Sequence, residues 1–503
     1  MKRNSFIGIL AFLVLSIFTG RDATAGNLPR TTPEAEGIPS SVITTLFDSL
    51  MSLPDTEMHS IMVLRHGNVV AETYPTPFSP EYNHTMYSCS KTFVGAAVGL
   101  AIADNRLRLT DRVATFFPEA LPAEISPELA AMTVRDLLTM TSGIQPDWNM
   151  RNNRRDWVRG YLSKPVSTHG KSFKYDSLCT YMLSAIVQKV TGKTLLEYLR
   201  PRLFEPMNIW DVEWEVSPEG YNTGGWGLHI QSESLAKFGQ LLLNGGEWAG
   251  RQVLPQHWVK AMMTRQVEAG NEDYGYQIWM CDYPGAWRAD GAYGQYVIVV
   301  PSKDMVIVVT QCSMMDGMKE RQIIWRTLLD HVADTATDDP KAYSNLLKKQ
   351  KAYTFPTVQG KSTSWKASAL EGRKIALANN PFGWKTIKFN FADKALTAEI
   401  TDFVGKITVL KAGYNSWTTT QIGSNPPYSI AAIGRMHGLK APFHAAASYA
   451  WDKAGTSLAM RIHYVDWISA LGVTLRFTDM NNVSLEIRPN YENRTHTIKG
   501  TIE

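Results

Sequence analysis

The amino-acid sequence predicts an α+β domain, with an antiparallel sheet flanked by helices, followed by an all-β sandwich or barrel domain. Two observations predict this order. Before about residue 337, strand-like apolar runs lie near both ends of the region and helical periodicities lie between them. After about residue 366, apolar residues recur at every second position, which is typical of strands. A chain of 503 residues is long enough for roughly two to four domains and a large buried core.

Two β-hairpins and several helices are expected in the first region. Residues 61–71 predict two strands around the turn His66-Gly67-Asn68, and residues 296–310 predict two strands around Pro301–Asp304. Helical spacing of apolar residues predicts helices over about 88–100, 133–141, 178–190, 232–243 and 322–332. Glycine follows three of these stretches, where it commonly ends a helix.

The composition changes at about residue 338. Asp338-Asp339-Pro340 is expected to end the last helix, and a polar stretch continues to Trp365. Beyond it, alternating apolar residues predict strands at 387–391, 458–464, 471–477 and 483–487. We therefore expect one domain over residues 26–337, a linker over 338–365 and an all-β domain over 366–503.

The first 25 residues predict a cleaved signal peptide. Lys2 and Arg3 precede the apolar run Phe6–Phe18, and Ala23-Thr24-Ala25 supplies the small residues that a signal peptidase reads. The run is too short to span a bilayer comfortably, although an uncleaved anchor is the alternative. We expect a periplasmic or extracellular protein that begins near Gly26 and does not insert into a membrane after cleavage.

Charge and cysteine usage exclude several classes of partner. The net charge of +4 is too small to suggest a nucleic-acid partner. No CxxC pair or histidine cluster is present, so neither a metal nor another cofactor is expected. The four cysteines are too few for a disulfide framework, and the sequence leaves their pairing open: Cys89, Cys179, Cys281 and Cys312.

Ser88 and Lys91 form the first candidate chemical pair. They open a predicted helix three residues apart, so both side chains project from the same face. A buried lysine with a lowered pKa can accept the serine proton, and the helix N-terminus offers N–H groups to an oxyanion. Ser234 and Lys237 share the spacing, but they lie in the middle of a predicted helix, where we expect a solvated face.

Two later segments supply further candidate groups. Tyr175-Asp176-Ser177 precedes a helix, and a tyrosine near a cationic lysine can ionise more easily and move a proton to a leaving group. The run 290–295, which contains Gly291 and Ala292, leads into a strand. Glycine at a strand edge lets a substrate approach the backbone, and a strand N–H can complete an oxyanion hole.

These elements, in this order, resemble the serine β-lactamase and penicillin-binding-protein superfamily. The likeness is closer to its class C-like branch of esterases, D-aminopeptidases and 6-aminohexanoate-dimer hydrolases. It covers about residues 30–335, and further matching stretches are Thr133–Gly143, Gly224-Gly225-Trp226, Leu235–Leu241, Asn244–Trp248 and Trp258. The resemblance implies a β-lactamase-like fold for the first domain.

The resemblance also implies roles for individual residues. Ser88 would be the nucleophile, Lys91 its general base and Tyr175 the proton shuttle. Ser177 would support them, and the N–H groups of Ser88 and Ala292, next to Gly291, would form the oxyanion hole. Further candidates for substrate binding are Asp147, Trp148, His229 and Asp290.

One position departs from the β-lactamase pattern. Ala289 stands where those enzymes keep a cationic or hydrogen-bonding residue for the β-lactam carboxylate. The adjacent Arg288 is expected to point to the other face of its strand. Penicillin is therefore a doubtful substrate, and an ester or small amide without that anionic group fits better.

The sequence thus predicts a secreted serine hydrolase that cleaves a small-molecule ester, amide or peptide through a Ser88 acyl-enzyme. The first alternative is a penicillin-binding-type sensor that acylates slowly or not at all. A second alternative is that the β-domain captures a ligand that the hydrolase domain then trims.

Overall fold

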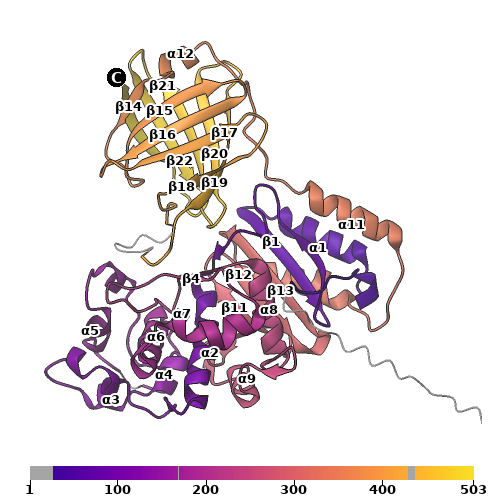
Figure 1. Ribbon diagram of the computed structural model, residues 1–503, viewed down its shortest axis with the longest axis vertical. Coiled ribbons are helices and arrows are strands. Elements are labelled where there is room, and N and C mark those ends of the chain that lie inside the picture. Colours follow the sequence, from indigo (N-terminus) through magenta and orange to yellow (C-terminus); the bar gives the residue numbers. More distant parts are fainter. Residues whose placement is uncertain (1–26, 168, 429–436) are drawn as a thin grey trace, which may run out of the picture.

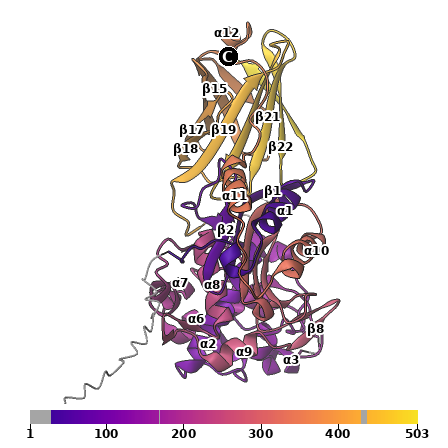
Figure 2. The same ribbon diagram turned by 90° about the vertical axis from the view of Figure 1, so that its right-hand side faces the viewer.

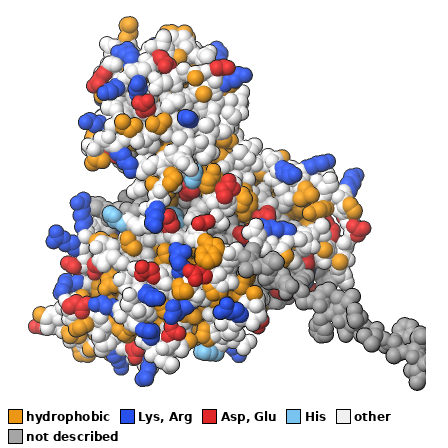
Figure 3. All heavy atoms as spheres, in the orientation of Figure 1, with side chains coloured by type: hydrophobic (Ala, Val, Ile, Leu, Met, Phe, Trp, Pro, Cys, Tyr) orange, Lys and Arg blue, Asp and Glu red, His pale blue; other side chains and the backbone are white. Residues whose placement is uncertain are grey.

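The computed structural model describes residues 27–167, 169–428 and 437–503, and it divides into a lower body of helices and strands and an upper β-barrel (Figure 1). The expected signal peptide and its cleavage point lie outside the described residues. Both ribbon views show the barrel standing above β1 (Thr56–Arg65) and α11 (Pro340–Ala352) of the lower body (Figure 1, Figure 2). Charged side chains of both signs are interspersed over the face shown in Figure 3. No helix in the described ranges is both long and apolar enough to cross a membrane.

The lower body is built on an eight-stranded antiparallel sheet with the order β2-β1-β13-β12-β11-β10-β9-β8. Its other strands are β2 (Asn68–Thr73), β8 (Val267–Ala269), β9 (Glu272–Tyr274), β10 (Trp279–Met280), β11 (Trp287–Gly291), β12 (Gln295–Val300) and β13 (Met305–Ser313). Both predicted hairpins are confirmed, since β2 pairs with β1 and β13 with β12. Short strands form two smaller sheets: β3 (His84–Thr85), β4 (Glu213–Trp214) and β5 (Leu228–Ile230), and β6 (Glu247–Trp248) with β7 (Arg251–Gln252).

Helices cover both faces of the large sheet. They are α1 (Ser40–Met51), α2 (Ser90–Ala103), α3 (Pro127–Ala131), α4 (Val134–Leu138), α5 (Trp157–Leu162), α6 (Ser177–Thr191), α7 (Leu195–Leu199), α8 (Ser232–Leu243), α9 (Gln256–Met262) and α10 (Gly317–Thr327), with α11 and α12 (Ala367–Leu370) after them. On β1, Met62 and Leu64 join the core that contains α2 and α8, whereas Ile61 and Val63 join the core that contains α1 and α10. Side chains alternate between the two faces of a strand, so this body has three layers. The predicted α+β class is confirmed.

Two helices differ in extent from the prediction. α4 is shorter because Thr133 and Asp136 cap its start reciprocally and Met140 adopts a left-handed φ of 58° soon after its end. α10 begins earlier, at Gly317, because the Asp316 side chain accepts a hydrogen bond from the Met318 N–H.

The stretch 338–365, which we expected to be a linker, contains the helix α11. Asp339 caps it by accepting a hydrogen bond from the N–H of Ala342, and Pro340 takes the first helical position, where no N–H is needed. Leu346 is fully buried in the core beneath α1. The expectation that Asp338-Asp339-Pro340 end a helix is wrong, because α10 already ends at Thr327 and Asp339 and Pro340 start α11 instead.

The upper body is a closed barrel, which decides between the sandwich and the barrel left open by the sequence. Its strands are β14 (Lys374–Leu377), β15 (Trp384–Ala392), β16 (Ala395–Asp402), β17 (Ile407–Gly413), β18 (Thr418–Ile422), β19 (Phe443–Trp451), β20 (Ser457–Tyr464), β21 (Ala470–Phe477), β22 (Asn482–Pro489) and β23 (His496–Ile502). Neighbouring strands pair antiparallel, and a parallel pairing of β17 with β19 closes the ring. All four predicted strands of this region are confirmed.

Candidate active site

Ser88 lies in a tight turn directly before α2. The 3₁₀ turn Tyr87–Cys89 places Tyr87 at a left-handed φ of 44°, an uncommon conformation for a bulky residue. The Ser90 hydroxyl stabilises this turn, since it donates to the Tyr87 carbonyl (2.6 Å) and accepts from the Leu228 N–H (3.1 Å). The turn therefore holds Ser88 at the N-terminal end of a buried helix.

Lys91 is buried beside Ser88 and makes three hydrogen bonds. Its ammonium group donates to Ser88 Oγ (2.8 Å), Ser177 Oγ (2.8 Å) and the Gly225 carbonyl (2.6 Å). Burial lowers the pKa of Lys91 from 10.5 to about 7, against a smaller opposing effect of Asp176. A lysine with this pKa is partly neutral at physiological pH and can accept a proton.

Ser177 and Gly225 are brought to Lys91 by close packing of a glycine loop against α6. A side-chain carbon added at Gly225 would lie 2.3 Å from the Ser177 carbonyl oxygen. Asp176 caps α6 by accepting from the Leu178 N–H (2.9 Å), which sets Ser177 in the first turn. The matching stretch around Gly224-Gly225 thus has a physical reason, because a larger residue would push the Gly225 carbonyl away from Lys91.

Tyr175 also contacts this pair. Its hydroxyl is hydrogen-bonded to Ser88, and its ring centroid lies 4.8 Å from Lys91 Nζ. Burial raises the pKa of Tyr175, so the expectation that it ionises more easily is wrong. The physical reason is that the ring packs among Tyr274 and Trp279, where desolvation outweighs any nearby positive charge. Tyr175 therefore keeps its proton and can donate it.

The end of β11 packs closely against the turn that holds Ser88. A side-chain carbon on Gly291 would lie 2.3 Å from the Met86 carbonyl oxygen, so glycine is needed for this approach. Gln295 links the two segments, because its carbonyl accepts from Cys89 Sγ (3.1 Å) and its side-chain amide donates to the Ala292 carbonyl (3.1 Å). This arrangement places Ala292 beside Ser88.

Ser88, Tyr175, Ser177 and Ala292 open onto one cavity of about 320 Å³, here called the Ser88 cavity. It is lined by Tyr87, Ser88, Trp148, Arg151, Tyr175, Ser177, Trp226, Trp279, Arg288, Asp290 and Ala292. Among our candidates for substrate binding, Trp148 and Asp290 lie in this lining and Asp147 and His229 do not. Asp147 pairs with Lys164 (2.6 Å), and His229 packs against Trp467 of the barrel.

Arg288 lines the cavity, so the expectation that it faces away is wrong. Alternation along β11 puts Arg288 and Asp290 on the cavity side and buries Ala289 in the core. Arg288 forms ion pairs with Asp290 (2.7 Å) and Glu272 (2.6 Å), and Glu272 also pairs with Arg321 (2.7 Å). The two arginines and two carboxylates of this cluster balance one another.

Ser234 and Lys237 do not form the solvated face that we expected. Both are largely buried in α8, which packs on the sheet, and Lys237 donates to the Asn208 carbonyl (3.3 Å). Neither residue lines the Ser88 cavity. The sequence gave no signal for Arg151 and Trp279 and marked Trp226 only as part of a matching stretch, yet all three reach the cavity, from separate segments.

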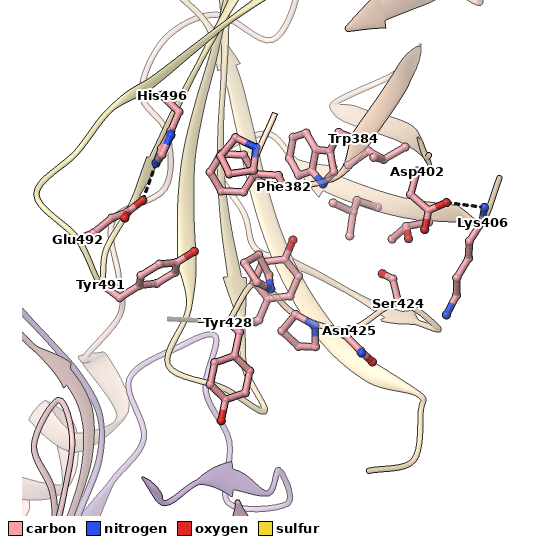
Figure 4. A pocket seen from close by; sticks show the side chains of 17 residues that line it. Phe382, Trp384, Asp402, Lys406, Ser424, Asn425, Tyr428, Tyr491, Glu492 and His496 are labelled. Carbon is pink, nitrogen blue, oxygen red and sulfur yellow. Dashed lines mark hydrogen bonds and ion pairs between the residues drawn. The ribbon is translucent and has the colours of Figure 1, made fainter. Parts of the chain in front are cut away.

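The barrel carries a second cavity of about 480 Å³ at the end that faces the lower body (Figure 4). Its wall includes the aromatic side chains of Phe382, Trp384, Tyr428 and Tyr491, and a His496–Glu492 contact of 2.6 Å lies at one side. Tyr428 points from this cavity toward the lower body, where its hydroxyl donates to Glu215 (2.9 Å). Within the described residues, no group of three potential metal-ligating side chains is close enough to hold an ion, and all four cysteines are free thiols.

Comparison with known proteins gives matches over the lower body. A protein-family model described as Beta-lactamase matches residues 49–330, more than half of the chain. The 6-aminohexanoate-dimer hydrolase of Paenarthrobacter ureafaciens is 25% identical over 298 residues, which cover 53% of this chain and 76% of that protein.

Solved structures also resemble the chain. An octameric penicillin-binding protein homologue from Pyrococcus abyssi covers 91% of this chain and 98% of its own, with a TM-score of 0.48 and 15% identity. A penicillin-binding protein homologue from Caulobacter crescentus covers 65% of this chain and 100% of its own, with a TM-score of 0.47 and 15% identity.

Proposed function

Because the chain belongs to the beta-lactamase family, we propose that it is a serine hydrolase that cleaves an ester or amide bond through an acyl-enzyme on Ser88. One observation carries the proposal. Lys91 Nζ lies 2.8 Å from Ser88 Oγ, and its pKa is lowered to about 7. A hydroxyl beside such an amine is an activated nucleophile.

The acylation step follows from these contacts. Ser88 Oγ attacks the substrate carbonyl carbon while its proton passes to the neutral amine of Lys91. The N–H groups of Ser88 and Ala292 stabilise the oxyanion. Tyr175 then donates its proton to the leaving oxygen or nitrogen and regains one from Lys91, so the alcohol or amine departs and the Ser88 ester remains.

Deacylation reverses the same proton transfers. Water attacks the Ser88 ester and gives a proton to the Lys91–Tyr175 pair, and Ser88 Oγ leaves as the pair returns the proton to it. Ser177 and Gly225 keep Lys91 within reach of Ser88 throughout. The products are a carboxylic acid and the free enzyme.

The cavity favours small substrates with an apolar surface. Trp148, Trp226 and Trp279 form much of its wall, and a volume of about 320 Å³ suits a small ester, amide or short peptide. The name of the Paenarthrobacter relative, 6-aminohexanoate-dimer hydrolase, supports a hydrolase of a small molecule. Export to the periplasm or beyond the cell is part of the proposal and rests on the sequence pattern of residues 1–25.

Activity-based labelling tests this function. A fluorophosphonate probe should label Ser88 covalently, and p-nitrophenyl butyrate should be turned over. Ser88→Ala should abolish both signals without unfolding the protein, and Ser234→Ala, with the same atom removed from α8, should keep both. Labelling without turnover would identify the slow penicillin-binding-type sensor instead, and no labelling at Ser88 would overturn the proposal.

A further inference from the structure

Arg151 lines the Ser88 cavity from the 3₁₀ turn η5 (Trp148–Asn152). Its side chain is only 5% exposed, although it carries a charge. Its Nε donates to the Trp148 carbonyl (2.7 Å), and its guanidinium carbon lies 4.1 Å from the centre of the Trp148 ring. The Trp226 ring lies on another side, at 5.8 Å. Two indoles and one turn therefore hold the guanidinium in place.

This guanidinium has no counter-ion within the described part of the chain. Its Nη1 is buried without a hydrogen-bond partner there. Asp147 and Glu215 are the acidic groups that act on it, and neither forms an ion pair with it: Asp147 pairs with Lys164 (2.6 Å), and Glu215 accepts a hydrogen bond from the neutral Tyr428 hydroxyl (2.9 Å). Burial accordingly lowers the pKa of Arg151 to about 10.

A comparison with Arg288 indicates that Arg151 binds a negatively charged group of a ligand. Both line the same cavity, but Arg288 forms ion pairs with Asp290 and Glu272, which it shares with Arg321. Buried charges in proteins are normally paired, because an unpaired one loses its hydration without compensation. A ligand that brings a negative charge to Arg151 would remove this cost and gain a charge-assisted hydrogen bond.

We propose that Arg151 binds a carboxylate of the substrate, so that the bond cleaved at Ser88 belongs to an ester or amide that also carries a free carboxylate. A single charge is favoured over a phosphate, because Arg288, the other cation in the described cavity lining, is already neutralised. Trp148 and Trp226 would contact the chain between the carboxylate and the scissile bond. The substrate carboxylate would then be bound by Arg151 of η5, and not by the β11 position that Ala289 occupies. This inference rests on the proposed function.

Two pairs of esters test the inference on either side of the scissile bond. Mono-p-nitrophenyl adipate and p-nitrophenyl hexanoate differ by a carboxylate in the acyl part. The esters 4-carboxyphenyl butyrate and 4-carbamoylphenyl butyrate differ by a carboxylate in the leaving group. For each pair the measured quantity is the ratio of kcat/KM for the carboxylate ester to kcat/KM for the neutral ester.

Arg151→Gln should lower this ratio about ten- to a hundredfold in one of the pairs, as expected for a lost charge-assisted hydrogen bond. Arg151→Lys keeps the charge but loses the planar guanidinium, so it should give an intermediate ratio. This variant tests the inference even if Arg151→Gln fails to fold. Arg154→Gln removes the same charge from the exposed part of this loop and should leave the ratio within about twofold, since exposed charges are screened.

Binding to the Ser88→Ala variant separates this inference from the proposed function. Calorimetric titration with the two carboxylate esters should show binding that Arg151→Gln, in the same background, weakens about tenfold or more. Turnover of the esters with a ratio that Arg151→Gln does not change would overturn the inference and leave the hydrolase intact. Loss of binding on Arg151→Gln in a protein that hydrolyses none of the esters would overturn the function alone.

Discussion

Lys91 makes all of its hydrogen bonds to uncharged oxygen atoms, those of Ser88, Ser177 and Gly225. A carboxylate partner would hold the ammonium form and raise its pKa, whereas hydroxyl and carbonyl oxygens stabilise it less. Burial therefore dominates, and the pKa falls to about 7. The neutral surroundings of this one side chain are what make it a proton acceptor.

The rate should follow the deprotonation of Lys91. Since the neutral amine is the active form, kcat/KM for p-nitrophenyl butyrate should rise from pH 6 to pH 8 with a midpoint near 7 and then level off. Lys91→Arg should lose nearly all activity at every pH, because a guanidinium stays protonated. A midpoint near 10, or activity that survives in Lys91→Arg, would contradict the role of Lys91 as the base.

At the scale of the element, α11 is held to the lower body by one face of a largely polar helix. Leu346 is fully buried beside Phe47 of α1, and Tyr353, just after the helix, donates to Asp48 (2.8 Å). Lys349 forms an ion pair with Asp48 as well. α11 thus anchors the segment that leads to the barrel.

Two adjacent leucines of α11 give a matched test of this anchor. Leu346→Ala should lower the free energy of unfolding by about 2–5 kcal/mol, because it removes a fully buried side chain. Leu347→Ala, at a position that is 39% exposed, should change it by less than about 0.5 kcal/mol. Urea unfolding followed by tryptophan fluorescence measures both. Equal effects of the two substitutions would show that α11 is not docked on α1.

At the scale of the whole molecule, neutral histidines lie buried where the barrel meets the lower body. His59 and His84 share a hydrogen bond (2.9 Å), and His463 of the barrel packs against Phe355 and Trp417. Arg461 and Glu57 are the charged groups near His463, and Glu57 lies 3.9 Å from it. Burial lowers the pKa of all three histidines, that of His84 to about 3.

The junction should weaken in mild acid. The unfolded chain takes up protons near pH 6.5 and the buried rings do not, so stability is complete above that pH and is lost as the pH falls below it. Each ring that stays neutral at pH 5 should cost about 2 kcal/mol of stability relative to pH 7. Urea unfolding at the two pH values measures the loss.

His463→Phe should reduce this acid-induced loss by about 2 kcal/mol, because the phenyl ring fits the same aromatic surroundings and does not titrate. His257→Phe, at an exposed position of α9, should leave the loss unchanged. An acid-induced loss that is the same in His463→Phe as in the unaltered protein would show that His463 does not contribute.

The sequence by itself determined the helices and strands that are specified by the spacing of residues close together in the chain. Apolar periods of two and of 3.6 predicted both hairpins of the lower body, four strands of the barrel and five of the helices. The three-residue spacing of Ser88 and Lys91 at a helix start predicted that these two side chains lie together, whereas only the resemblance to the β-lactamase superfamily implied that Tyr175 and Ser177 join them. Spacing within one turn places side chains together whatever the rest of the chain does.

Only the tertiary structure decided what depends on contacts between distant segments. Closure of the barrel requires β17 to reach β19, and the burial of α11 requires a partner surface on α1. Arg288 pairs with carboxylates, whereas Arg151 forms no ion pair with a carboxylate of the described residues, and this difference follows from which carboxylates the fold brings near each. Residue type shows that both are cations, but the cost or benefit of a charge is set by its burial and neighbours, which a local pattern does not contain.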